Sequence, residues 1–146
     1  MILPDVNLLL HAYNLDSPIH AVARLWWEDC LTSNRPVRLP WVVVLGFLRL
    51  STHRTIATDP LPIDAACRAV DSWLTRPQVL LLHPGRRHAE ILFDLLRGVG
   101  TGGNLTTDAH LAALAIEYDV ELNSTDSDFG RFPGLRWSNP LSFKQS

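Results

Sequence analysis

The sequence predicts an α/β protein, a three-layer α/β/α sandwich around a parallel sheet of four to five strands. Two observations predict this class. Short apolar runs alternate along the 146 residues with longer segments whose apolar residues recur at helical spacing, which is the pattern of βαβ units. Hydrophobic residues make up 47% of the chain, enough for one packed core in a chain of this length. We therefore expect a single domain over residues 1–146.

In the first half of the chain, two short strands are separated by helices. The expected elements in order are a strand at 1–3, helices at 6–14 and 17–33, a strand at 36–40, a helix at 41–54, a loop at 55–62 and a helix at 64–75. Ser17 and Pro18 are typical of a helix start. Segment 41–54 is rich in β-branched residues. Its length and the i, i+3, i+4 spacing of its apolar residues nevertheless favour a helix.

The second half continues the alternation. The expected elements are a strand at 78–84, a helix at 87–98, a loop at 99–104, a helix at 104–119, a strand at 120–123 and an edge strand at 135–137. The apolar run within 78–84 is typical of a strand buried on both faces. We expect Gly98 to end its helix, and Asn104 or Thr106 to cap the next one.

Composition excludes several classes of protein. The net charge of −2 and the sequence pI of about 6.3 give no general positive field that would attract nucleic acid. Cys30 and Cys67 fall in helical patterns, so we expect small core residues and no disulfide framework. The longest apolar run, at 41–48, is too short to span a bilayer, and Asp5 argues against a signal peptide. We expect a cytoplasmic protein with no membrane contact.

Acidic residues follow the ends of two expected strands. Asp5 follows the first strand, and Asp126 and Asp128 follow the strand at 120–123. In open parallel sheets the carboxyl ends of strands share one edge, so these residues should converge, and the helix at 104–119 can bring Asp108 to the same edge. Taken singly, each has a structural explanation as a helix cap, a turn cap or a favourable charge at a helix N-terminus.

Taken together, these carboxylates predict a metal site. Three or four carboxylates in one pocket cannot all ionise without a counter-charge. Hard divalent cations such as Mg²⁺ or Mn²⁺ are the usual partners of such oxygen ligands. The site would suit phosphodiester hydrolysis, because an ion lowers the pKa of an attacking water and neutralises charge on the leaving oxygen.

Three segments carry a resemblance to a known family. They are "DVNLLLHAY" (5–13), "LPWVVVLGFLRLST" (39–52) and "TDAHLAALAIEYDVELNSTDSDFGRFPGLRWSNPL" (107–141). Through these segments and the order of elements between them, the chain resembles PIN-domain proteins, specifically the VapC toxins of bacterial type II toxin–antitoxin systems. The resemblance implies a Mg²⁺-dependent endoribonuclease that cleaves RNA and inhibits translation. It also implies a cognate VapB antitoxin that restrains the toxin, and a homodimer.

The resemblance also implies roles for individual residues. Asp5, Asp108 and Asp126 would bind the metal, with Asp128 as an additional acid in the catalytic set. The polar neighbours that would orient these carboxylates are Asn7, Thr107 and Thr125.

One position departs from the family pattern. Many PIN domains carry a Glu in the helix after the second strand, where this chain has Gly46. This difference leaves open whether one or two ions bind. It also supports an alternative, a catalytically weak PIN-like protein that acts through protein or RNA interaction. Glu90 and Glu117 are candidates to replace the acid, although Glu117 lies nine residues beyond Asp108 and should face the opposite side of its helix.

Two basic clusters are candidates for contacts with RNA phosphates. They are Arg49, His53 and Arg54 at the end of one expected helix, and Arg86, Arg87 and His88 at the start of another. From these we select Arg49 and Arg87 as substrate-binding candidates. A solvated helix end explains each cluster as well.

Overall fold

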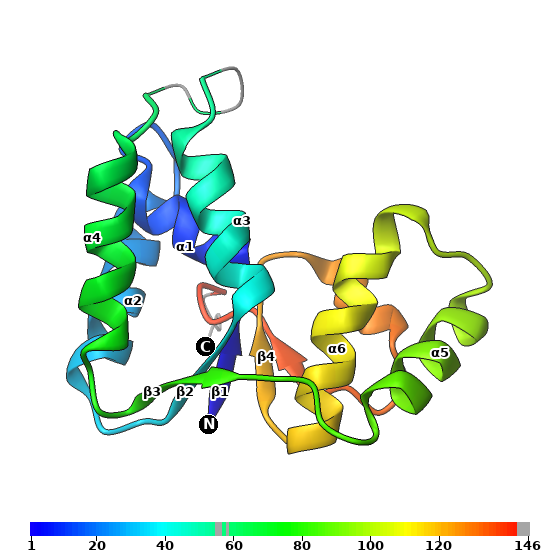
Figure 1. Ribbon diagram of the computed structural model, residues 1–146. Helices are drawn as coiled ribbons and strands as arrows, with labels where there is room; N and C mark the ends of the chain where they lie inside the picture. Colours follow the sequence, from blue (N-terminus) through cyan, green and yellow to red (C-terminus); the bar gives the residue numbers. More distant parts are fainter. Residues whose placement is uncertain (55–56, 58, 143–146) are drawn as a thin grey trace.

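A computed structural model describes residues 1–54, 57 and 59–142 (Figure 1). Five strands in these residues form one parallel sheet in the order β3-β2-β1-β4-β5. The strands are β1 (Ile2–Pro4), β2 (Val37–Pro40), β3 (Val79–Leu82), β4 (Glu121–Asn123) and β5 (Trp137–Ser138). The α-helices are α1 (Val6–Tyr13), α2 (His20–Thr32), α3 (Trp41–Thr52), α4 (Ile63–Leu74), α5 (His88–Val99) and α6 (Thr106–Tyr118). Two short 3₁₀ helices are η1 (Gly103–Leu105) and η2 (Ser127–Arg131).

Strand β1 lies in the middle of the sheet and marks the point where the strand order reverses. The chain leaves β1 to form β2 on one side and returns later to form β4 on the other. The ends of β1 and β4 are in register, because Pro4 pairs with Asn123 and the Asp5 N–H donates to the Asn123 carbonyl at 2.8 Å. Ligands of open α/β sheets bind at such a reversal, outside the carboxyl ends of the strands. Asp5 and the residues after Asn123 are therefore placed at the expected binding edge.

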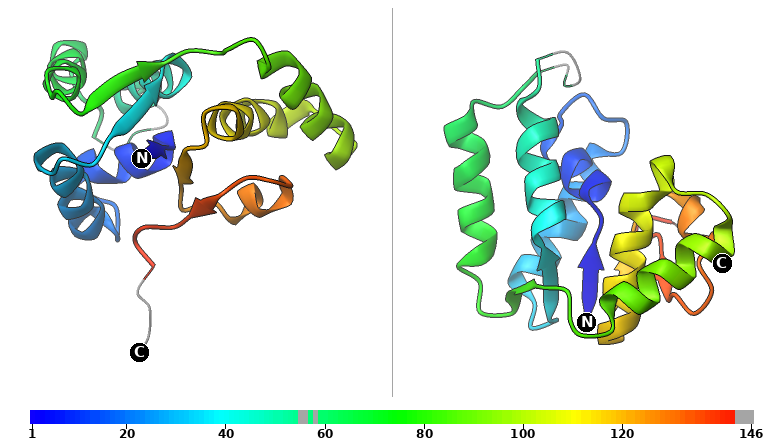
Figure 2. Two further views of the ribbon diagram at one scale, coloured as in Figure 1. Left: turned by 90° about the horizontal axis from the view of Figure 1, so that it is seen from below. Right: turned by 45° about the vertical axis from the view of Figure 1, so that its right-hand side comes forward.

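Helices cover both faces of the sheet, which confirms the predicted sandwich. Viewed from below, α1, α2 and α4 lie on one face and α5 and α6 on the other (Figure 2). Helix α3 continues directly from β2 and packs against α1 and α4. Helix α6 is buried nearly all round its middle, where Leu111, Ala112, Ala113, Leu114 and Ala115 are all inaccessible. Small and branched side chains in this run let α6 pack closely against both the sheet and α5.

One aromatic side chain from each of the first four helices meets in the core. Trp73 of α4 lies 4.8 Å from Phe47 of α3 and 5.4 Å from Trp27 of α2, measured between ring centroids. Its indole N–H donates to the Tyr13 hydroxyl of α1 at 2.9 Å. Offset and edge-to-face aromatic pairs add specificity to apolar burial, so this cluster fixes how the four helices pack.

The structure confirms the predicted helices and strands but corrects several boundaries. Helix α2 begins at His20 without a side-chain cap, and the Ser17 hydroxyl accepts the Ile19 N–H instead. Gly98 lies inside α5, and the helix ends at Gly100, which has the left-handed φ of 75° that Gly adopts at low cost. Helix α6 begins at Thr106 and has no side-chain cap, so neither Asn104 nor Thr106 has the predicted role.

Two core predictions were also wrong. Strand β3 is not buried on both faces, because it lies at the edge of the sheet and Leu80 is 53% exposed. Cys30 is buried as expected, but Cys67 is exposed because α4 turns Ala66, Val70 and Trp73 towards the core. Part of the predicted loop at 55–62 lies outside the described residues. Within the described part of the chain, no helix combines the length and the apolar character needed to cross a bilayer.

Candidate active site

Asp5 is a buried carboxylate at the start of α1. It caps the helix, since its Oδ1 accepts the Val6 N–H at 2.7 Å, while its Oδ2 accepts the Ser124 hydroxyl at 2.8 Å. Only 6% of its surface is exposed. Burial raises the pKa of Asp5; the two hydrogen bonds oppose this, and the charge of Asp126 adds to it. The carboxylate therefore caps α1, and its ionised form is destabilised by burial at the edge of the sheet.

Ser124 connects the segments that build the site. It is fully buried directly after β4. Its hydroxyl donates to Asp5 and accepts from the Asn7 side-chain amide at 3.2 Å and from the Asp126 N–H at 3.0 Å. A serine hydroxyl has one proton and two lone pairs, so these three bonds use its full capacity. Ser124 thus holds Asp5, Asn7 and the Asp126 backbone in a fixed arrangement.

Ser124 was not among the residues predicted from the sequence, whereas its neighbour Thr125 was. Among the described residues, neither the Thr125 nor the Thr107 side chain hydrogen-bonds to a carboxylate, and Thr107 is exposed. The position of Ser124 in the sequence could have identified it as a site residue. It is the first residue after a buried strand, and its hydroxyl can accept a hydrogen bond from the Asp126 backbone N–H, two residues later.

Asp126 and Asp128 occupy the turn after β4. Asp126 caps η2, because its Oδ1 accepts the Asp128 N–H at 2.9 Å. Asp128 is half exposed, and its carboxylate lies 3.7 Å from the Arg131 guanidinium. The turn-cap explanation for Asp126 is therefore correct, and it leaves the second oxygen of this carboxylate available.

Asp108 shows that the four acids share one electrostatic environment. It lies half-buried in the first turn of α6. Burial and the charges of Asp5, Asp126 and Asp128 together raise its pKa to about 6. Carboxylates from three distant parts of the chain therefore act on one another, as the strand-end rule predicted.

The donor set fits a hydrated divalent cation. Asp5, Asp108, Asp126 and Asp128 offer hard oxygen atoms, and a cation would relieve the repulsion that raises the pKa of Asp108. Within residues 1–54, 57 and 59–142, no three His, Cys, Asp or Glu side chains are arranged to hold one ion directly. Mg²⁺ usually keeps several waters and takes only one or two carboxylates. The set thus suits an ion that retains part of its water shell.

Gly46 is explained by helix packing. A Cβ atom at this position would lie 3.2 Å from Val6 Cγ2, in the residue next to Asp5. Helices α1 and α3 therefore approach closely beside the site, and a Glu at position 46 would require Val6 to move. The chain thus has a close contact between α1 and α3 at the position where many PIN domains have a Glu.

Neither proposed replacement acid joins the four aspartates. Glu90 is exposed in the first turn of α5. Glu117 accepts two backbone N–H groups, from Gly85 and Arg87, each at 2.9 Å. Both oxygens of its carboxylate therefore bind the loop between β3 and α5. Gly85 leaves room for this carboxylate, because a Cβ atom at position 85 would overlap it.

Replacing Glu117 with Gln should lower stability and leave RNA cleavage unchanged. The amide keeps one acceptor oxygen, so one charge-assisted bond to the loop is lost, at a cost of about 1–2 kcal/mol in the free energy of unfolding. Urea denaturation and an RNA cleavage assay check this. A loss of cleavage greater than the loss of folded protein would support Glu117 as the replacement for the missing acid.

The basic candidates differ in accessibility. Arg49 lies in the last turn of α3 and Arg87 directly before α5; both are exposed, and neither pairs with a carboxylate in the described part of the chain. His88 is buried and bonds through Nε2 to His110 Nδ1 at 2.9 Å, so it packs α5 on α6 and is not a phosphate ligand. Burial and the neighbouring His88 lower the pKa of His110.

Replacing Ser124 with Ala should reduce both cleavage and stability. The Asp5 carboxylate, the Asn7 amide and the Asp126 N–H each lose a partner in a buried site. Loss of a residue that orients metal-binding carboxylates typically costs about 10–100-fold in activity, and buried polar groups left unpaired cost about 1–3 kcal/mol. Cleavage kinetics and urea denaturation measure both effects. Ser142→Ala, at an exposed position, is the matched control; equal behaviour of the two variants would contradict the role of Ser124.

Comparisons with known proteins identify relatives that match nearly the whole chain. A family model described as PIN domain matches residues 2–135. Ribonuclease VapC33 of Mycobacterium tuberculosis is 44% identical over 141 residues, which cover 97% of this chain and 99% of that protein. Ribonuclease VapC37 of the same organism is 46% identical over 136 residues, covering 93% and 94%.

Solved structures share the fold. The crystal structure of Mycobacterium tuberculosis VapC20, described as a sarcin–ricin loop cleaving toxin, matches with a TM-score of 0.67 and 19% identity, covering 93% of this chain and 99% of the other. VapBC2 from Rickettsia felis, bound to a DNA fragment from its promoter, matches with a TM-score of 0.69 and 17% identity, covering 95% and 98%. At these identities the likeness concerns the fold alone.

Proposed function

Since the chain belongs to the PIN domain family, we propose that it is a VapC-type endoribonuclease, the toxin of a type II toxin–antitoxin system. Its relatives at 44% and 46% identity over nearly their full length are named ribonucleases. The observation that carries the proposal is the shared environment of Asp5, Asp108, Asp126 and Asp128 at the strand reversal, where the pKa of Asp108 rises to about 6.

The proposed cofactor is Mg²⁺, which Mn²⁺ can replace. PIN ribonucleases in general depend on a divalent metal, and the carboxylates at this edge fit one. Asp5, Asp108 and Asp126 would bind the ion, directly or through its water shell, with Asp128 as an additional acid. When bound, the ion would activate an attacking water and neutralise charge on the leaving oxygen of the phosphodiester.

Other residues of the chain would orient the metal-binding carboxylates and the RNA. Ser124 fixes the Asp5 carboxylate through a 2.8 Å hydrogen bond and also binds Asn7, so the acids keep their relative orientation when substrate enters. Asp108 is half-buried in the first turn of α6, and a bound ion would favour its ionised form. Arg49 and Arg87 are exposed and would contact RNA phosphates as bidentate donors.

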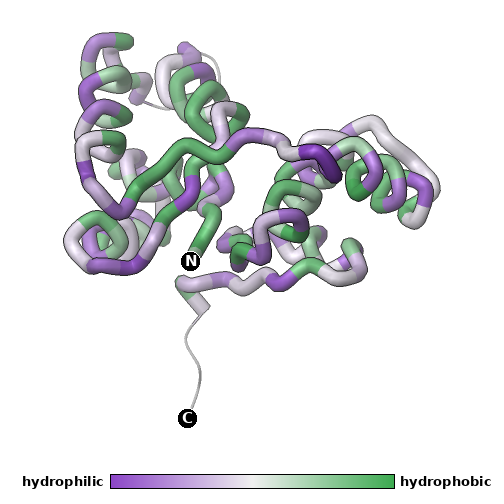
Figure 3. Tube along the Cα trace, turned by 60° about the horizontal axis from the view of Figure 1, so that its bottom comes forward, coloured by the Kyte–Doolittle hydropathy of each residue, from purple (hydrophilic) through white to green (hydrophobic). Residues whose placement is uncertain are grey.

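The proposed protein partners are a VapB-type antitoxin and a second copy of the chain. A solved neighbour is a VapBC complex, which supports a VapB partner here. Support for a homodimer comes from large apolar side chains that are exposed, namely Trp41 and Leu45, one turn apart on α3, and Leu80 on β3. Strand β3 is a hydrophobic edge strand that runs between hydrophilic segments (Figure 3). Such a surface is typical of an interface. The proposed place of action is the cytoplasm.

A second candidate function is binding of protein or RNA by a catalytically weak PIN-like protein. The lack of an acid at position 46 favours this alternative. Incubation of the purified chain with tRNA, ribosomal RNA and messenger RNA separates the two. If the chain is a ribonuclease, we expect defined cleavage sites with Mg²⁺ or Mn²⁺ and no cleavage with EDTA. Sequencing the 5′ ends of the products maps these sites. Absence of cleavage in every RNA, with a VapB-type antitoxin still bound, would support the binding protein.

A further inference from the structure

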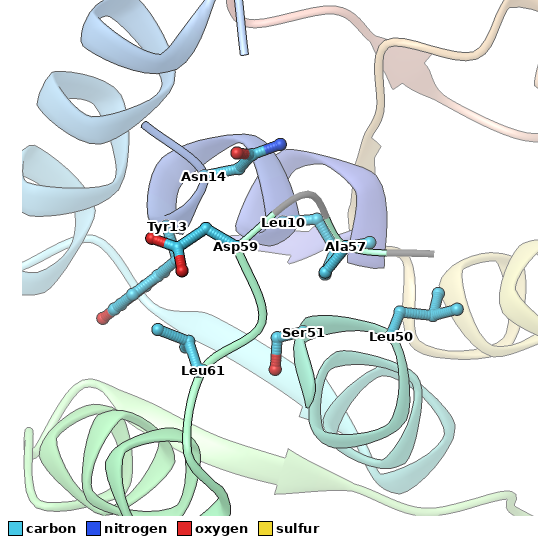
Figure 4. A pocket seen from close by; sticks show the side chains of 8 residues that line it. All are labelled: Leu10, Tyr13, Asn14, Leu50, Ser51, Ala57, Asp59 and Leu61. Atoms are coloured by element: carbon cyan, nitrogen blue, oxygen red, sulfur yellow. The ribbon is translucent and has the colours of Figure 1, made fainter. Parts of the chain in front are cut away.

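A cavity of about 140 Å³ lies between α1, the C-terminal end of α3 and the residues Ala57, Asp59 and Leu61 (Figure 4). Leu10 and Tyr13 line it from α1, Leu50 and Ser51 from α3, and Asp59 and Leu61 from the segment that leads to α4. Engineered cavities of about 150 Å³ with apolar walls bind benzene. The cavity is therefore large enough for one small organic molecule.

The cavity arises from the way the two helices pack. Gly46 lets α3 approach Val6 closely near the start of α1. Further along, Tyr13 of α1 and Ser51 of α3 both line the cavity. The Leu61 N–H donates to the Ser51 carbonyl at 2.8 Å and fixes the third wall. The residues that line the cavity therefore come from two helices and from a segment that is hydrogen-bonded to the second of them.

Two polar groups at this cavity have no partner in the described part of the chain. The Ser51 hydroxyl is buried, with 8% of the residue exposed, and forms no hydrogen bond. Asp59 is an exposed lining residue and forms no ion pair in the described part of the chain. A buried hydroxyl without a partner costs free energy that a ligand can recover. A carboxylate beside the cavity attracts cations and repels anions.

We propose that this cavity binds a small organic cation, an aromatic or short aliphatic amine. Its apolar body fills the space between Leu10, Leu50 and Leu61, and its ammonium group lies against Asp59. The Ser51 hydroxyl supplies the second polar contact. This site is distinct from the four aspartates, because it lies at the opposite end of α1 from Asp5, about 12 Å away for a helix of eight residues.

Benzylamine is a suitable probe, with benzyl alcohol as its uncharged counterpart. Titration of the full chain, followed by methyl NMR, should show saturable binding with shifts confined to Leu10, Leu50 and Leu61. Benzylamine should bind more tightly than benzyl alcohol. Asp59→Asn should weaken benzylamine about two- to fivefold, the range for an exposed ion pair, and leave benzyl alcohol unchanged. Asp71→Asn, an exposed acid on α4, is the matched control and should have no effect.

A larger side chain at Ser51 tests the location of the site. Ser51→Leu should fill the cavity and abolish binding of both probes, and thermal unfolding shows that the variant is folded. Shifts elsewhere in the wild-type chain, or equal effects of Asp59→Asn and Asp71→Asn, would overturn the proposal. The Asp5→Asn chain should bind benzylamine as tightly as the wild type, so failure of the nuclease proposal and failure of this one give different results.

Discussion

Replacing Asp5 with Asn should abolish RNA cleavage with little effect on the fold. Asp5 is the most buried of the four acids and interacts with Asp126 and Asp108. Loss even of residues that only orient metal ligands costs about 10–100-fold, so loss of this carboxylate should exceed about 100-fold. Gel-based cleavage assays at saturating Mn²⁺ measure the effect.

The stability of the same variant separates a catalytic role from a structural one. Asn relieves a buried charge whose pKa is raised, which stabilises the fold. It also removes one acceptor from the Ser124 hydroxyl, which destabilises the fold. These opposed effects should leave the free energy of unfolding within about 1 kcal/mol of the wild type without metal. Asp16→Asn, at an exposed position, is the control. Full cleavage by Asp5→Asn, or a large loss of stability that explains the lost activity, would contradict the proposed role.

Metal binding and RNA cleavage should fall as the pH drops below about 6. The pKa of Asp108 is raised to about 6 by burial and by its three acidic neighbours, and a divalent ion requires the ionised form. Cleavage should therefore decrease about tenfold per pH unit below this value if one proton controls it. The increase in Tm caused by Mn²⁺ should likewise be larger at pH 7.5 than at pH 5.5.

Without metal, the stability should change with pH in the opposite direction. The folded-state pKa of Asp108 lies above its unfolded value of 3.8, so the folded chain holds this proton more tightly. Its contribution to stability is fully present below pH 3.8 and is lost as the pH rises through about 6. Urea denaturation in EDTA, with wild type compared to Asp108→Asn, isolates this contribution. A difference between the two proteins that does not vary between pH 4 and pH 7 would contradict it.

The fold and the convergence of the acids could be predicted because both follow from chain order. Alternating strands and helices imply parallel pairing, and parallel strands bring their carboxyl ends to one edge. The register of Pro4 with Asn123 then places Asp5 beside the segment that carries Asp126. Asp5 and Asp126 also cap the helix and the turn that follow them, so the structural and functional explanations apply to the same residues.

Details set by three-dimensional packing could not be predicted. Whether Ser124 or Thr125 faces the acids depends on the local turn after β4, which composition does not specify. The role of Gly46 depends on a contact with Val6, forty residues earlier. His88 resembled a surface phosphate ligand, but the packing of α5 on α6 turns it inward against His110. The cavity beside Ser51 has no sequence signal, since its lining residues come from three separate segments of the chain.

The proposed function requires that the carboxylates at the ends of β1 and β4 share a divalent cation. An anomalous difference map from a crystal soaked in Mn²⁺ would locate this ion. We expect a peak between the Asp5 and Asp126 side chains in the wild type and its loss in Asp5→Asn. A map with no peak among the four aspartates, or with the same peak in both proteins, would contradict it.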